Sequence, residues 1–267
     1  LLILLVVWSN YFLKVFKYKQ IKPKFQKAVL ACGIVGLVFQ TTGVVALATS
    51  KAMDSTELQK RIAENEKAIA ENKKNAKSDG SVEKGKADDY ASSGNSQKVS
   101  DKGLFCLGDS VMLSAYTNIQ DIYPDATIDA AVSRQIYHAL DILSWYKSQG
   151  NIHNTIVISL GTNGVLDEKT VEQLLEMIGK DKSIFWVNVY APGVEWEASN
   201  NKYLNELAKK HSNVTIIDWN SYISKHTDLL EADGIHPIEE GADAYAKLIQ
   251  KSINSVMKKQ KKIEENK

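Results

Sequence analysis

The sequence has 267 residues, a formal net charge of +1 and 44% hydrophobic residues. Such a balanced charge argues against a dedicated nucleic-acid-binding protein, which would carry a basic face or stripe. The two cysteines, Cys32 and Cys106, both lie in apolar runs. A disulfide framework and a thiolate metal site are therefore not expected.

The first fifty residues have the character of a membrane segment. Residues 28–50 form an uncharged run long enough to cross a bilayer as one helix, and residues 1–13 fit the end of another span. Six lysines lie between them, at positions 14, 17, 19, 22, 24 and 27. Under the positive-inside rule this loop stays cytoplasmic, so the transmembrane helix places everything after residue 50 outside the cell. The alternative interpretation of the lysines is an ordinary solvated loop.

The chain begins with Leu and shows no signal peptide. We therefore expect residues 1–27 to be the end of a longer membrane domain with a basic cytoplasmic loop. Residues 51–100 should connect the membrane helix to a globular domain. Their first half is charged and alanine-rich, with Leu58, Ile62 and Ile69 at roughly helical spacing, which predicts a helical stalk or a short coiled-coil seam. From residue 78 the Gly, Ser and charged residues predict a flexible linker.

Residues 101–267 alternate between apolar strand-like runs and amphipathic helical patterns. The predicted strands are 104–107, 127–130, 155–160, 184–189 and 214–217, and the predicted helices are 110–122, 134–148, 168–178, 198–210 and 238–258. This alternation predicts a three-layer α/β/α sandwich with a central parallel sheet. In such folds the ligand site lies at the carboxyl ends of the strands.

Four motifs fall at those strand ends and suggest acyl-transfer chemistry. They are Gly108-Asp109-Ser110, Val132-Ser133-Arg134, Gly161-Thr162-Asn163-Gly164 and Asp233-Gly234-Ile235-His236-Pro237. A serine nucleophile needs a base, and the base needs a carboxylate to orient it. His236 and Asp233 supply both for Ser110 from one short loop. The Asn163 amide and the backbone N–H groups of Ser110 and Ser133 are candidate donors for an oxyanion hole. Asp109 is expected to cap the following helix or brace a loop.

These motifs resemble the four blocks of the SGNH hydrolase superfamily, also called GDSL-type esterases. The resemblance covers about residues 101–258 and implies a flavodoxin-like fold, with Ser110 as nucleophile, His236 as base, Asp233 as its partner and Asn163 as an oxyanion donor. Two positions depart from the family pattern. Ser133 stands where the second block normally offers a glycine, and Gly164 replaces an aspartate in the third block.

A membrane helix, a linker and an SGNH domain in this order resemble the C-terminal part of OatA-type peptidoglycan O-acetyltransferases. That resemblance implies a cell-membrane protein whose extracellular domain transfers acetyl from a membrane acyltransferase domain to the C6 hydroxyl of N-acetylmuramic acid, without a metal or cofactor. Two alternatives remain open: an extracellular carbohydrate esterase with the same residues, and an inert wall-binding module. Zinc binding by Asp233 and His236 lacks a supporting cluster.

Two further residues each allow two interpretations. Arg134 would contact an anionic sugar substituent or face solvent at the start of a helix. Trp196 would form a wall of the acceptor site or pack under its own loop.

Overall fold

The computed structural model describes residues 57–74, 99–100 and 103–266. The predicted membrane helix at 28–50, the segment before it and most of the linker lie outside these residues. None of the helices in the described ranges combines the length and apolar character that a bilayer crossing requires. All the described residues belong to one compact unit.

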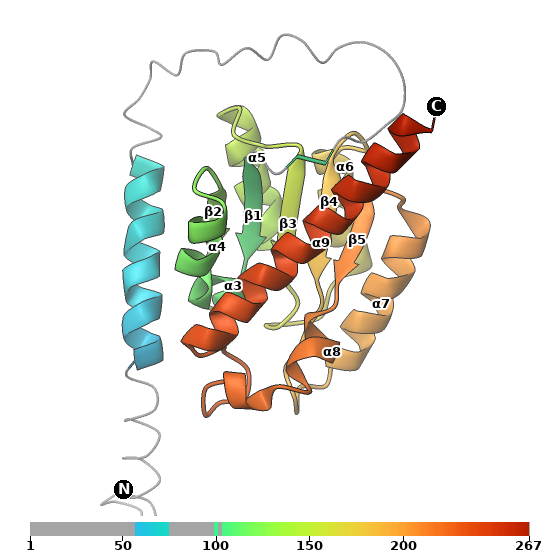
Figure 1. Cartoon of the computed structure of the whole chain (residues 1–267). Coiled ribbons are helices and arrows are strands. Elements are labelled where there is room, and N and C mark those ends of the chain that lie inside the picture. Colours follow the sequence, from blue (N-terminus) through green and yellow to red (C-terminus); the bar gives the residue numbers. More distant parts are fainter. Residues whose placement is uncertain (1–56, 75–98, 101–102, 267) are drawn as a thin grey trace, which may run out of the picture. The chain divides into compact units, whose positions relative to one another are not determined.

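The centre of this unit is a five-stranded sheet in which every neighbouring pair is parallel (Figure 1). Its strands are β1 (Leu104–Gly108), β2 (Thr127–Ala130), β3 (Thr155–Ser159), β4 (Ser183–Val187) and β5 (Val214–Ile217). They follow the spatial order β2-β1-β3-β4-β5. This is the flavodoxin-like order, whose switch point lies between β1 and β3. The expected central parallel sheet is confirmed.

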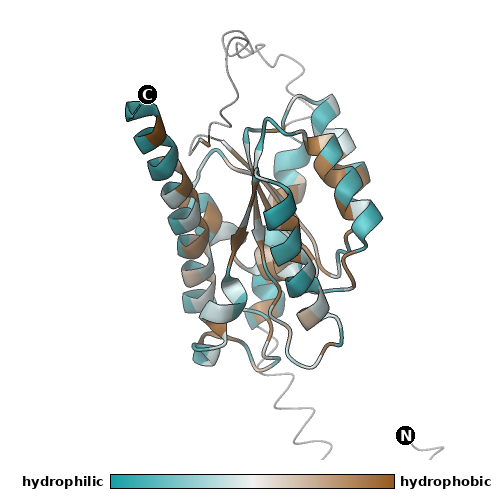
Figure 2. Ribbon diagram, turned by 90° about the vertical axis from the view of Figure 1, so that its right-hand side faces the viewer, coloured by the Kyte–Doolittle hydropathy of each residue, from teal (hydrophilic) through white to brown (hydrophobic). Residues whose placement is uncertain are grey.

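Alternating side chains of each strand serve two separate cores, one on each face of the sheet. In β1, Leu104 and Cys106 join one cluster, whereas Phe105 and Leu107 join the other. All five residues of β1 are buried, which is why the strand appears in the sequence as an unbroken apolar run. In Figure 2 the strands are mainly hydrophobic, while the helices carry both hydrophobic and hydrophilic residues.

The helices form a layer on each face of the sheet. The Cys106 face is covered by α3 (Ser110–Ser114), α4 (Tyr116–Ile122) and α9 (Glu239–Glu265), and the Phe105 face by α5 (His138–Ser148), α6 (Glu168–Ile178) and α7 (Glu197–Lys210). Two short elements, α8 (Trp219–Ile223) and the 3-10 helix η2 (Thr227–Leu229), lead from β5 to α9. Because all five strands run in the same direction, the loops that follow them lie at one edge of the sheet (Figure 1).

Several helical segments differ from the prediction, and α9 continues to Glu265 instead of ending at residue 258. The helix expected over 110–122 is split at Ala115, whose N–H donates to the Met112 carbonyl three residues back (3.0 Å) and closes the last turn of α3. The helix expected from residue 134 begins only at His138, because residues 131–137 form a loop. The short helix α8 was not predicted; Asp218 caps it by accepting from Ser221 N–H.

Residues 57–74 are helical, and one face of this helix packs on the globular domain. Ile69 belongs to the same core cluster as Leu104 and Cys106, and Asn65 is also buried. The spacing of Leu58, Ile62 and Ile69 thus indicated a helix, but it did not reveal that its apolar stripe faces the domain.

Candidate active site

The register of the sheet brings three of the predicted motifs to one edge. Gly108 at the end of β1 pairs with Ala130 of β2 and with Ser159 of β3. Each of the loops after these strands carries one motif, so all three leave the sheet side by side. The fourth motif lies in the loop before α9.

Ser110 is the first residue of α3, directly after the turn that follows β1. The Asp109 carboxylate caps this helix by accepting from Val111 N–H (3.0 Å), and Asp109 N–H donates to the Ser159 carbonyl (3.0 Å). A Cβ atom at position 108 would lie 2.4 Å from the Met112 side chain, so only glycine allows the helix to turn back this closely. The expected cap by Asp109 is confirmed.

Asp109 is fully buried, and burial raises its pKa from 3.8 to about 6 against the opposing hydrogen bond from Val111. We expect Asp109→Asn, which keeps the oxygen that accepts from Val111 N–H, to gain stability relative to wild type by up to about 3 kcal/mol between pH 4 and pH 8. The cost of ionising the buried carboxyl is absent below pH 4, grows as the pH rises through 6 and is complete above it. Urea unfolding at about pH 4 and pH 8 measures this; an equal gain at both pH values would contradict it.

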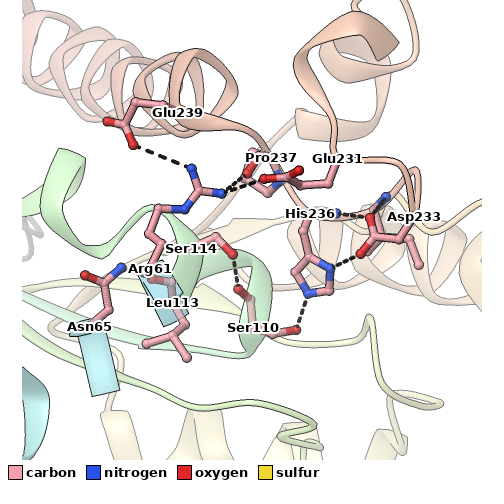
Figure 3. A network of polar contacts seen from close by, with 11 residues as sticks. Arg61, Asn65, Ser110, Leu113, Ser114, Glu231, Asp233, His236, Pro237 and Glu239 are labelled. Carbon is pink, nitrogen blue, oxygen red and sulfur yellow. Dashed lines mark hydrogen bonds and ion pairs between the residues drawn. The ribbon is translucent and has the colours of Figure 1, made fainter. Parts of the chain in front are cut away.

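The imidazole of His236 lies between Ser110 and Asp233 (Figure 3). Its Nε2 is 2.8 Å from Ser110 Oγ, and its Nδ1 is 2.6 Å from Asp233 Oδ2. With the proton on Nδ1, the ring donates to the carboxylate, and Nε2 is free to accept from the serine hydroxyl. The structure thus brings together three residues that the sequence separates by up to 126 positions.

The loop that carries His236 and Asp233 is held by its own backbone. Asp233 Oδ1 accepts from the N–H groups of Ile235 (2.9 Å) and His236 (3.0 Å), and Gly234 has a φ of 69°, which favours glycine. Partial burial would raise the pKa of Asp233, but hydrogen bonds from the His236 ring and these N–H groups outweigh it and lower the pKa to about 2. The Asp233 carboxylate is therefore ionised at every pH at which the His236 imidazole can act as a base.

Arg134, in the second motif, does not face solvent. Its guanidinium is buried, forms an ion pair with Asp129 (2.6 Å) and donates to the Gly108 carbonyl (3.0 Å). These contacts tie the second loop to the end of β1. Ser133, the predicted second oxyanion donor, is exposed and has a φ of 57°. This left-handed backbone is the kind of position at which a glycine is easily accommodated.

The third motif is held from α7. Asn200 is buried, and its amide donates to the carbonyls of Gly161 (2.9 Å) and Gly164 (2.9 Å) and accepts from Leu166 N–H (2.9 Å). The Trp196 ring donates to the Thr162 carbonyl (3.2 Å), so it braces this loop. The Asn163 amide approaches the Arg134 carbonyl at 3.5 Å, which places it beside the second motif.

Two residues that hold the loops of the site, Asn200 and Asp129, were not predicted from the sequence. Asn200 is one of two adjacent asparagines in an amphipathic helix, and no pattern distinguishes it from a surface residue. Asp129 lies in a predicted strand five residues before Arg134, and a buried charge so close to an arginine was the available signal. Within the described part of the chain, no group of three or more His, Cys, Asp or Glu side chains could hold a metal ion.

Comparison with known proteins places this geometry in context. The crystal structure of the C-terminal catalytic domain of Streptococcus pneumoniae peptidoglycan O-acetyltransferase A, with a methylsulfonyl adduct, is 29% identical; the match covers 58% of this chain and 93% of that one, with a TM-score of 0.53. The resemblance to SGNH-type O-acetyltransferase domains is confirmed.

Two curated relatives agree with the structural match to this SGNH-type domain. A putative peptidoglycan O-acetyltransferase of Bacillus subtilis, YrhL, is 34% identical over 154 residues, which are 58% of this chain and 24% of that protein. Peptidoglycan O-acetyltransferase OatA of Listeria monocytogenes is 32% identical over 148 residues, which are 55% of this chain and 23% of that protein. The chain thus spans about a quarter of the curated relatives it matches. No family model matches the sequence.

Proposed function

We propose that this chain is the C-terminal part of a peptidoglycan O-acetyltransferase, which moves acetyl through an acetyl-Ser110 intermediate to the C6 hydroxyl of N-acetylmuramic acid. The observation that carries the proposal is the row of hydrogen bonds from Ser110 Oγ to His236 Nε2 (2.8 Å) and from His236 Nδ1 to Asp233 Oδ2 (2.6 Å). This arrangement activates a hydroxyl for attack on an ester. The names of the similar proteins supply peptidoglycan as the substrate, and the family resemblance supplies the muramoyl C6 hydroxyl.

In the first half of the reaction, Ser110 Oγ attacks the carbonyl carbon of the acetyl donor while its proton moves to His236 Nε2. Asp233, ionised and bonded to Nδ1, stabilises the imidazolium that forms. The tetrahedral intermediate collapses, and the bond to the donor oxygen breaks as that oxygen takes the proton from His236. Acetyl-Ser110 remains.

In the second half, the muramoyl hydroxyl gives its proton to His236 Nε2 and attacks the acetyl carbon. The bond to Ser110 Oγ then breaks, and the serine recovers its proton. Both tetrahedral intermediates carry negative charge on one oxygen. Ser110 N–H at the first turn of α3, together with Ser133 N–H and the Asn163 amide on the two neighbouring loops, are the donors we assign to it.

A carbohydrate esterase with the same residues is the second candidate, and solvent access favours it. The Asp233 side chain is 41% exposed and that of His236 is 19% exposed, so water reaches the loop that carries the base. Water attacking acetyl-Ser110 would release acetate instead of an acetylated sugar. The transferase requires the bound sugar hydroxyl to compete with water, through its position and the exclusion of solvent.

The cellular setting rests on the sequence of the first fifty residues. We infer that residues 28–50 anchor the chain in the cell membrane, that residues 1–27 end a membrane acyltransferase domain which delivers acetyl, and that the SGNH-type domain meets peptidoglycan outside the cell. The basic loop before residue 28 and the uncharged run after it support this orientation.

Mass spectrometry of the protein after brief exposure to an activated acetyl ester tests these assignments. We expect an acetyl adduct on Ser110, and its transfer to added muramoyl glycan should yield an acetylated sugar. Faster loss of ester with glycan but no acetylated sugar would favour the esterase, and an adduct elsewhere would remove Ser110 as nucleophile. In intact cells, a membrane-impermeant acyl ester should label Ser110 as well; protection until lysis would contradict the extracellular location.

A further inference from the structure

The helix over residues 57–74 contacts the loop that carries His236. Arg61, on the buried side of this helix, forms an ion pair with Glu231 (3.3 Å), donates to the Pro237 carbonyl and approaches Glu239 of α9 at 3.5 Å (Figure 3). Glu231 and Pro237 immediately flank the segment that contains Asp233 and His236. One guanidinium therefore holds both ends of the loop.

The two ends of this loop lie close together, so that a single side chain can contact both. Leu230 and Pro237 form an antiparallel bridge, and Glu231 N–H donates to the His236 carbonyl (2.8 Å). The side chains of Arg61 and Glu231 are only 14% and 15% exposed. A planar guanidinium with several fixed donors suits two acceptors on opposite arms of a loop better than a lysine ammonium does.

The same helix also contacts the segment that carries the nucleophile. Asn65 Nδ2 donates to the Leu113 carbonyl of α3 (2.8 Å), and Asn65 Oδ1 accepts from Thr117 Oγ1 (3.1 Å). Farther along, Lys73 forms an ion pair with Asp129 (2.7 Å), the residue that also holds Arg134. The helix is thus bonded to the nucleophile helix, to the loop that carries His236 and to Asp129, the partner of Arg134 in the second motif.

We propose that the helix over residues 57–74 sets the distance between Ser110 and His236, and that Arg61 is a positioning residue for the catalytic base. This rests on the proposed function, because it assumes that the two residues react together. Without Arg61, the loop loses both the ion pair at Glu231 and the hydrogen bond to the Pro237 carbonyl, and it is free to shift. A displacement of the base by about 1 Å lowers the rate by about 100-fold.

The test compares full-length variants in the hydrolysis of an activated acetyl ester, with active sites counted by the acetyl burst. Arg61→Ala should lower kcat per active site by about 10- to 100-fold with little change in KM, since Arg61 touches no reacting atom. Arg61→Lys should restore part of the loss. Lys67→Ala is the matched control: it removes a cation from the same helix, where Lys67 is 78% exposed and pairs only loosely with Glu71 (3.9 Å).

If Arg61→Ala has the wild-type kcat per active site, the proposal is overturned. This holds even if fewer molecules fold, because a residue with a purely structural role changes only the number of active sites. If Arg61→Ala yields no folded protein, Glu231→Gln tests the same contact from the loop, and wild-type kcat there likewise overturns it. Ser110→Ala separates the two claims. Activity that survives in Ser110→Ala defeats the proposed function, whereas its loss alongside an unaffected Arg61→Ala defeats only the role of Arg61.

Discussion

Ser110→Ala should lower kcat for acetyl transfer and for ester hydrolysis by about four to six orders of magnitude, while the fold is retained. The substitution removes the only atom to which acetyl is attached in the proposed mechanism, and it leaves the Asp109 cap and the His236 loop in place. Initial rates with an activated acetyl ester, and the melting temperature of the same samples, measure the two effects.

Ser114→Ala is the matched control for this prediction. Ser114 lies in the same short helix, is equally buried and donates to the Ser110 carbonyl (2.8 Å), but its hydroxyl does not contact His236. We expect it to keep most of the activity. Equal activity of Ser110→Ala and wild type would instead support a wall-binding module without catalysis.

Asp233→Asn should lower kcat by about two to four orders of magnitude. The amide matches the carboxylate in size, but it no longer stabilises the imidazolium, and its NH2 group favours the His236 tautomer with Nε2 protonated, which cannot accept the Ser110 proton. Single-turnover measurements of acetyl-Ser110 formation would show the loss directly. Asp228→Asn, at an exposed position in η2, is the control and should react at the wild-type rate.

The pH dependence of these variants follows from the lowered pKa of Asp233, about 2. A lowered pKa means that the stability contributed by the ionised carboxylate is complete above its ordinary value of 3.8 and is lost as the pH falls toward 2. The stability of wild type relative to Asp233→Asn should therefore fall as the pH is lowered from about 4 toward 2, which urea unfolding of both proteins measures. A relative stability that stays the same between pH 4 and pH 2 would contradict the lowered pKa.

The sheet was predictable because its strands are buried on both faces. Each predicted strand from Leu104 to Ile217 matches an observed one within two residues, since a parallel strand between two helical layers must be apolar along its whole length. The motifs at the strand ends were predictable for a related reason: the carboxyl ends of parallel strands share one edge.

The supports of the site were not predictable in the same way. The pattern from Arg134 onward suits a helix, yet Arg134 is buried against Asp129 in a loop, and only the tertiary structure shows that the helix begins at His138. The residues that brace the site from other elements, Arg61 and Asn200, are polar positions on amphipathic helices. Periodicity identifies the apolar side of such a helix, but it does not identify the residues of other elements that the helix contacts.

The catalytic base and its carboxylate, His236 and Asp233, lie in a single turn of four residues. Asp233 accepts the backbone N–H of His236 as well as its ring, so the two side chains travel as one rigid unit. A shift of the turn as a unit would keep the bond between these two side chains and change only the distance from His236 to the Ser110 hydroxyl. An inactive and an active arrangement would then share the same acid–base pair and differ in that one distance.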